Sequence, residues 1–158
     1  MTPEELKFYR NNFQGFINEI GFRLTDVREG YAAGELTLTD FHRNPIGSTH
    51  GGVMFSIADT TGGAAAGSYG QACTTVSGNI NYLSPAMNCK KLISEAREVK
   101  VGKRMAVIDV MIRNEFGTDI AQATMRYYYL GPMEEYFDMT AVDEPDTGSS
   151  AVQSETEK

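Results

Sequence analysis

The residues best suited to chemistry lie in one short stretch that begins at Asn44 and leads into an apolar segment. An amide, an imidazole and two glycines occur in it, at Asn44, His50, Gly51 and Gly52. The His-Gly-Gly sequence predicts the start of a helix, where unpaired backbone N–H groups favour negative charge. Because glycine lacks a Cβ, a substrate carbonyl can approach the backbone closely at Gly51 and Gly52. The stretch therefore predicts a site that stabilises negative charge on a carbonyl oxygen.

Asp59 is the second candidate, because it is the only charged residue in positions 51–89. A lone carboxylate in an apolar segment is costly unless it is paired or has a function. Such a carboxylate can activate a water molecule as a general base. No Ser, Cys or His is flanked like an activated nucleophile, and the Gly-x-Ser-x-Gly motif is absent from the sequence.

Each candidate also has a purely structural interpretation. Asp59 could cap a local backbone group, and His50 could hydrogen-bond only its own loop. Asn44, which precedes a proline, could be an ordinary turn residue. The three tyrosines at positions 127–129 are expected to pack in a strand rather than to stack on a ligand. The residue types alone leave these alternatives open.

The elements that must position these residues follow from hydrophobic spacing. Residues 3–20 predict an amphipathic helix, with Thr2 as its N-cap. Residues 24–39 predict a strand pair or one long, bent strand, and residues 40–49 predict a loop. Residues 51–68 predict a helix that is apolar on nearly every side and is therefore buried.

The rest of the chain is predicted to be β-structure. The expected strands are 74–83, 91–101, 104–114 and 119–130. Five or six strands wrapped around one long helix would give an α+β domain. The sheet would leave one side of the helix open, and we expect a second copy of the domain to cover it. Gly62 and Gly63 cost that helix about 1 kcal/mol each in propensity. We expect close packing of another backbone to compensate.

Charge is distributed unevenly along the chain. Of 21 acidic residues, eight lie in 131–158 with a single base, which leaves 13 acids and 13 bases in 1–130. Seven of those bases fall between Lys90 and Arg113. A basic patch on a neutral domain suits a phosphate-bearing small molecule better than nucleic acid, although lysines on strand edges are the plainer explanation. The acidic, serine-rich range 143–158 is expected to be disordered.

Other features bear on compartment and cofactors. Cys73 and Cys89 are too few for a disulfide framework, which favours reduced thiols in a cytoplasmic protein. No apolar run is long enough to span a bilayer, and no signal-peptide pattern is present, so we expect no membrane partner. His42 and His50 are the only histidines, and their spacing matches no common metal site, so neither metal nor cofactor is expected.

The spacing of these motifs resembles that of a known family. Asn44, Gly47, His50-Gly51-Gly52 and Asp59, followed by the segment Asn79–Ala86, resemble the hotdog-fold acyl-CoA thioesterases of the phenylacetate-pathway type. The resemblance covers about residues 24–130. It implies a hotdog fold, in which an antiparallel sheet wraps around a long central helix, here with an extra N-terminal helix. One domain, 1–133, would precede an acidic tail, 134–158.

The resemblance also implies an activity, the hydrolysis of an acyl-CoA thioester to a free acid and CoA. The Gly51 N–H would polarise the carbonyl, and Asp59 would act as general base or nucleophile. Asn44 and His50 would shape the site. Thr75 would help to hold the water, although Thr74 and Ser77 compete for that role. Coenzyme A is then part of the substrate, and the candidates for binding its phosphates are Lys90, Lys91, Lys100, Lys103 and Arg104.

Helix geometry makes a further prediction about assembly. Gly51 and Asp59 are eight residues apart, so their backbones are separated by about 12 Å along the helix axis. One chain cannot easily bring them to the same carbonyl, whereas two helices related by a two-fold axis can. We therefore expect a homodimer or a dimer of dimers, a homotetramer.

Two alternatives differ in class from a thioesterase. A non-catalytic acyl-CoA or lipid-binding protein could keep the fold, although it would not need the carboxylate of Asp59. A hotdog dehydratase would place a histidine nearer to the Asn-Pro pair than His50 is to Asn44. The sequence does not predict which acyl group is bound.

Overall fold

The computed structural model describes residues 15–137 of the 158-residue chain. The helices and short 3-10 turns are α2 (Phe16–Ile20), η1 (Asp40–His42), α3 (Gly51–Gly67) and η2 (Met133–Glu135). The strands are β1 (Phe22–Arg28), β2 (Tyr31–Thr37), β3 (Gln71–Tyr82), β4 (Lys91–Val101), β5 (Met105–Asn114) and β6 (Asp119–Pro132).

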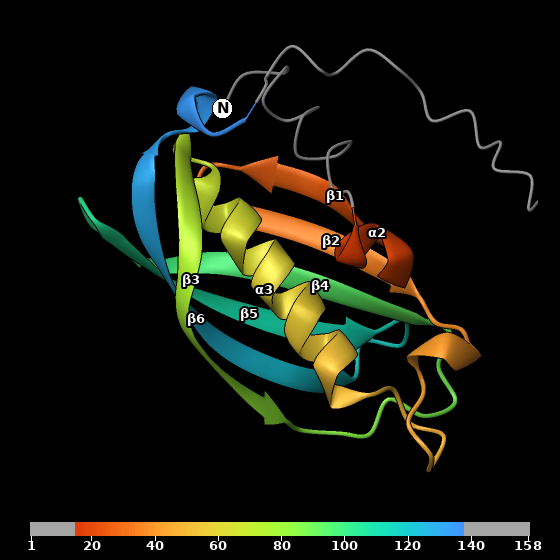
Figure 1. Cartoon of the computed structure of the whole chain (residues 1–158). Coiled ribbons are helices and arrows are strands. Elements are labelled where there is room, and N and C mark those ends of the chain that lie inside the picture. The colour runs from red at the N-terminus through yellow and green to blue at the C-terminus, as the bar shows by residue number, and fades with distance from the viewer. Residues whose placement is uncertain (1–14, 138–158) are drawn as a thin grey trace, which may run out of the picture.

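The six strands form one antiparallel sheet in the order β1-β2-β4-β5-β6-β3. The sheet curves around α3, which lies across its concave face (Figure 1). This arrangement confirms the predicted hotdog fold. Although β3 follows α3 directly in the chain, it pairs with β6 and so forms an edge of the sheet.

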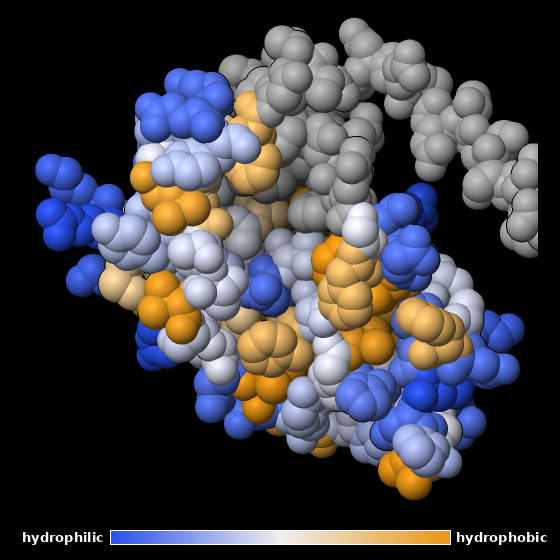
Figure 2. Space-filling model, in the orientation of Figure 1, coloured by the Kyte–Doolittle hydropathy of each residue, from blue (hydrophilic) through white to orange (hydrophobic). Residues whose placement is uncertain are grey.

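Before its last turn, helix α3 is buried mainly on the side that faces the sheet, whereas residues 64–67 are all buried. Its core contacts are made by apolar residues such as Met54, Ile57 and Ala65. A stripe at helical spacing on the opposite side, which includes Phe55, Asp59 and Gly63, is only half-buried. In Figure 2 the hydrophobic side chains gather over this face of α3 and β3, and the strongly hydrophilic ones lie mostly at its margins. One chain therefore leaves one side of the helix open.

Most of the predicted elements are confirmed. The range 24–39 is a strand pair rather than one bent strand, and the loop after it contains the short turn η1. Of the helix predicted over 3–20, the described part shows only α2, and residues 3–14 lie outside it. The tail beyond residue 137 also lies outside the described part, so the domain boundary at 133 stays a prediction. Within residues 15–137, no helix has the length and apolar character needed to cross a bilayer.

Candidate functional site

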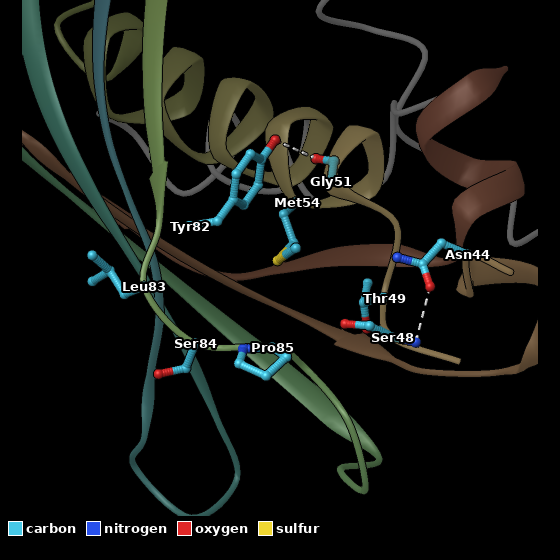
Figure 3. A pocket seen from close by; sticks show the side chains of 9 residues that line it. All are labelled: Asn44, Ser48, Thr49, Gly51, Met54, Tyr82, Leu83, Ser84 and Pro85. Atoms are coloured by element: carbon cyan, nitrogen blue, oxygen red, sulfur yellow. Dashed lines mark hydrogen bonds between the residues drawn. The ribbon is translucent and has the colours of Figure 1, made fainter. Parts of the chain in front are cut away.

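The loop before α3 is organised by Asn44. Its side-chain oxygen accepts hydrogen bonds from the backbone N–H groups of Ile46, at 3.2 Å, and Ser48, at 3.0 Å. The amide nitrogen points the other way, toward the pocket in front of α3 (Figure 3). Asn44 is therefore the turn residue that the simpler interpretation predicted, and it still presents a donor to the pocket.

The first turn of α3 offers one free backbone donor rather than two. His50 is the N-cap, and its Nδ1 accepts from the N–H of Gly52 at 2.9 Å. The expectation that both glycines donate to a carbonyl is thus wrong for Gly52. The N–H of Gly51 has no hydrogen-bond partner in the described part of the chain, because the first N–H groups of a helix lack intrahelical acceptors.

A pocket of about 340 Å³ opens in front of Gly51. Its walls come from the Asn44 loop, the first turn of α3 and the segment that follows β3 (Figure 3). Tyr82, the last residue of β3, covers the helix start, and its hydroxyl donates to the carbonyl oxygen of Gly51 at 2.9 Å. The pocket has room for a polar group beside the free N–H.

The carboxylate of Asp59 lies further along α3, in a second pocket. Thr75 on β3 donates its hydroxyl to Asp59 Oδ1 at 2.6 Å. Of the three hydroxyl residues considered for this strand, Thr75 is thus the one that contacts the carboxylate. No donor reaches Asp59 Oδ2 from within residues 15–137, so that oxygen can accept a proton.

Tyr127, on strand β6, contacts Asp59 through its hydroxyl. Its side chain is 1% exposed, and its hydroxyl donates to the backbone oxygen of Asp59 at 2.8 Å and lies 3.5 Å from Oδ1. Burial and the nearby carboxylate of Asp59 both raise the pKa of Tyr127. The phenol therefore stays protonated at neutral pH and remains a donor.

Gly62 makes the approach of Tyr127 possible. A Cβ at Gly62 would run into the Tyr127 hydroxyl, whereas one at Gly63 would be in ordinary contact with that ring at 3.6 Å. We expected another backbone to pack against this glycine pair. Within one chain that prediction is wrong, because the neighbour is the Tyr127 side chain. Burial and the charge of Asp59 also raise the pKa of Cys73, which lines this pocket, to about 11. Its thiol is protonated at neutral pH.

The two pockets divide the predicted site residues between them. The first contains Asn44 and Gly51, and the second, of about 200 Å³, contains Asp59 and Thr75. Gly51 and Asp59 are eight positions apart on α3, so the helix holds the two groups about 12 Å apart along its axis. A single chain therefore holds the predicted site residues in two separate pockets, which we call half-sites because the prediction assigns them to one site.

The predicted phosphate-binding residues also fall into two groups. Lys90 and Lys91 lie at the start of β4, and Lys91 donates to Glu35 at 2.8 Å. Lys100 lies near the other end of β4, and Lys103 and Arg104 lie in the turn between β4 and β5. At about 3.3 Å per residue, the ends of β4 are about 30 Å apart. The five residues are not one patch.

The remaining histidine has a structural role. His42 is 3% exposed; its Nδ1 accepts from the N–H of Thr39 at 2.9 Å, and its Nε2 lies 2.8 Å from the backbone oxygen of Ile20. Both cysteines are free. Across residues 15–137, no group of three or more His, Cys, Asp and Glu side chains could hold a metal ion.

Two tyrosines in contact with the half-sites were not identified from the sequence. Tyr82 was seen only as part of a motif, and Tyr127 only as a strand residue. Tyr127 and Tyr129 do pack in the core, and the Tyr129 hydroxyl donates to the Ala66 backbone oxygen at 3.0 Å. A glycine at 62 inside an otherwise regular helix was the available signal for a bulky neighbour.

Comparisons with known proteins place the chain in a family. Residues 46–121 match the family model of the thioesterase superfamily. Over 125 residues the chain is 30% identical to a protein of Archaeoglobus fulgidus described as an esterase, covering 79% of this chain and 81% of that one. Over 96 residues it is 32% identical to the acyl-coenzyme A thioesterase PaaI of Escherichia coli, covering 61% and 69%.

Solved structures agree with this placement. The E. coli PaaI structure superposes with a TM-score of 0.71 at 28% identity, covering 73% of this chain and 84% of that one. A thioesterase of Streptococcus pneumoniae solved with coenzyme A superposes with a TM-score of 0.67 at 26% identity, covering 70% and 90%. Structures of an Asp→Ala and a Thr→Ala variant of the S. pneumoniae protein match as well, each at 25% identity. The chain belongs to the thioesterase superfamily, and it is a thioester hydrolase with a hotdog fold.

Proposed function

We propose that the protein hydrolyses an acyl-CoA thioester to a free acid and CoA. The observation that carries the proposal is the pairing of Asp59 with Thr75, which occupies Oδ1 and leaves Oδ2 without a donor in the described part of the chain. A binding protein would have no need for such a carboxylate. The relatives support a CoA substrate, since one is named an acyl-coenzyme A thioesterase and another was solved with coenzyme A.

The reaction divides into two tasks. The N–H of Gly51 donates to the thioester carbonyl oxygen and stabilises the charge that develops there, an effect of about 3 kcal/mol per donor in known cases. Asp59 Oδ2 takes a proton from water while the water oxygen attacks the carbonyl carbon. The tetrahedral intermediate then breaks its C–S bond, and the CoA sulfur takes the proton back from Asp59. Direct attack by Asp59, with later hydrolysis of the anhydride, uses the same groups.

Asn44 and His50 complete the carbonyl half-site, and Thr75 orients the carboxylate. No metal or cofactor has a step in this scheme, and we expect none to be needed. The substitutions in the S. pneumoniae variants support the choice of carboxylate and hydroxyl. Their Asp and Thr positions are sixteen residues apart, the separation of Asp59 and Thr75 here.

The two half-sites must come from two chains. A second copy related by a two-fold axis would cover the open side of α3 and bring its Asp59 beside the Gly51 of the first copy. Each active site would then take Asn44, His50 and Gly51 from one chain, with Asp59 and Thr75 from the other. We therefore propose a dimer, or a dimer of dimers, as the active form.

A panel of acyl-CoA substrates tests the activity. Release of free CoA from short, long and aryl-acetyl thioesters should be measured with and without EDTA. We expect turnover of at least one substrate, unchanged by EDTA. Binding without turnover of any substrate would instead support a non-catalytic acyl-CoA-binding protein, and loss of activity in EDTA would contradict the metal-free scheme.

Mixing two inactive variants tests the shared site. Asn44→Ala and Asp59→Ala should each be nearly inactive alone. In a mixed dimer one site carries both changes and the other carries neither, so co-refolding should recover up to about half the wild-type activity per heterodimer. No recovery, despite subunit exchange demonstrated with tagged chains, would overturn the shared-site arrangement.

A further inference from the structure

Tyr82 has no part in the scheme above, yet it contacts the helix start that carries the free N–H (Figure 3). Its hydroxyl donates to the carbonyl oxygen of Gly51 at 2.9 Å. A Cβ at Gly51 would lie only 2.9 Å from that hydroxyl oxygen and 3.0 Å from the ring carbon that bears it. Gly51 is therefore the residue that lets the phenol approach.

The peptide between Gly51 and Gly52 is held from both ends. Tyr82 donates to its carbonyl oxygen, and its N–H, that of Gly52, donates to Nδ1 of His50 at 2.9 Å. A Cβ at Gly52 would lie 3.0 Å from that same ring nitrogen. Each glycine of the pair makes room for one side chain. Hydrogen bonds in such a chain polarise one another, so the bond from Tyr82 strengthens Gly52 as a donor.

The direction of the second bond determines the tautomer of His50. A backbone N–H can only donate, so Nδ1 of His50 must accept and carries no proton. The proton of the neutral ring is then on Nε2. The His50 side chain is exposed at the helix start, which leaves Nε2–H available as a donor outside the helix.

We propose that Tyr82 is a positioning residue: through the Gly51–Gly52 peptide it fixes the first turn of α3 and holds His50 with its proton on Nε2. The expected effect on turnover rests on the proposed function, whereas the hydrogen-bond chain does not. Tyr82 keeps the N–H of Gly51 aimed into the pocket without touching the reacting atoms.

Kinetics of Tyr82→Phe test the proposal. The change removes one hydroxyl and keeps the ring, and the side chain is 52% exposed, so the fold is not at risk. We expect kcat to fall about tenfold, the equivalent of about 1.4 kcal/mol, with KM within about twofold. Tyr128→Phe is the matched control, since Tyr128 is 43% exposed on a neighbouring strand, and it should leave kcat unchanged.

Two kinetic results would overturn the proposal. A rise in KM with unchanged kcat would mean that Tyr82 contacts the substrate directly. In a His50→Ala background, Tyr82→Phe should cost much less than it does in the wild type, because part of its effect passes through His50. Full additivity of the two changes would show that the residues act independently.

The imidazole nitrogens give a readout that does not depend on activity. The chain has two histidines, so a protein labelled with 15N-histidine gives two assignable rings. His42 has the same tautomer, fixed by Thr39 and Ile20, and serves as an internal reference. In Tyr82→Phe, we expect the His50 signals to move toward a mixture of tautomers while those of His42 stay in place. Unchanged His50 signals would overturn the proposal, even if no acyl-CoA were hydrolysed and the proposed function had failed.

Discussion

The two half-sites hold their functional groups by different means. At the start of α3 the proposed carbonyl-binding group is a backbone N–H, and its direction depends on the cap by His50 and on glycines that let side chains come close. At Asp59 the proposed base is a side chain, and two hydroxyls, from Thr75 and Tyr127, approach the same oxygen of it. A backbone N–H donor requires a fixed main chain. A carboxylate base requires one oxygen to be hydrogen-bonded and the other to be left without a donor.

The two surroundings also differ in polarity. Tyr82 and His50 are exposed at the first half-site. At the second, Tyr127 is buried and Cys73 is half-buried, and the pKa of each is raised by burial and by Asp59. Ionisation of these neighbours would place a second negative charge beside the carboxylate. Their raised pKa values prevent that across the neutral range, so neither of these two described neighbours adds a negative charge to the pocket.

The largest expected effect on kcat distinguishes the Asp59 carboxylate from the hydroxyl of Thr75 that orients it. Asp59→Asn keeps the shape of the side chain but removes the base, and kcat should fall by about 10³-fold, within the usual range for a general base. Thr75→Val removes only the hydroxyl that orients Asp59 and should cost less, about tenfold. Turnover of the best acyl-CoA substrate measures both.

A second Asp–Thr pair supplies the control for these variants. Thr124 donates its hydroxyl to Asp109 Oδ1 at 2.8 Å, on strands β6 and β5, away from both half-sites. Asp109→Asn should therefore leave kcat near the wild-type value. A similar loss at Asp109 and Asp59 would mean that the effect is on the fold rather than on catalysis.

The adjacent glycines of α3 give an intermediate effect. Gly62→Ala forces the Tyr127 hydroxyl away from Asp59, so we expect the melting temperature to fall by several degrees and kcat to fall with it. Gly63→Ala meets only an ordinary contact and gains up to about 1 kcal/mol of helix propensity, so it should be neutral or stabilising. Thermal unfolding compares the two. If Gly63→Ala proves the more damaging, the backbone of a partner helix, rather than Tyr127, determines the need for glycine.

The smallest expected effect separates the two ends of β4. Lys100, Lys103 and Arg104 have no ion pair within residues 15–137, whereas Lys91 is paired with Glu35. Charge reversal at Lys103 or Arg104 should therefore raise KM for acyl-CoA several-fold, more strongly at low salt, and exceed the effect of Lys91→Glu. Steady-state kinetics at two salt concentrations measure this difference. Wild-type KM values throughout would place the nucleotide of CoA elsewhere.

The sequence predicted the elements well because their signals are local. Alternation identified the strand from Lys91 to Val101 without error, and the apolar run after His50 identified α3. The position of β3 at the sheet edge beside β6 was not predicted, because it depends on pairing between residues such as Thr75 and Tyr127 that are far apart in the chain.

The site was predicted in its parts but not in its contacts. Spacing identified Asn44, Gly51 and Asp59. Helix geometry indicated that Gly51 and Asp59 would lie too far apart in one chain to reach the same carbonyl. The loss of the Gly52 donor could not be predicted, because a histidine at an N-cap position can turn toward the backbone or away from it. The contact of Tyr82 with Gly51 spans 31 positions and arises only when β3 packs against α3.

Strand β3 contributes a hydroxyl to each half-site, through Thr75 and Tyr82, and it is also an edge of the sheet. A second chain that covered β3 and the open side of α3 would therefore contact both half-sites. Under this arrangement, catalytic capacity belongs to the assembled pair rather than to the chain. By mass action, activity per chain would be constant at high protein concentration and would vanish on dilution below the dissociation constant of the pair. The cell would then set the onset of hydrolysis by how much of the protein it makes.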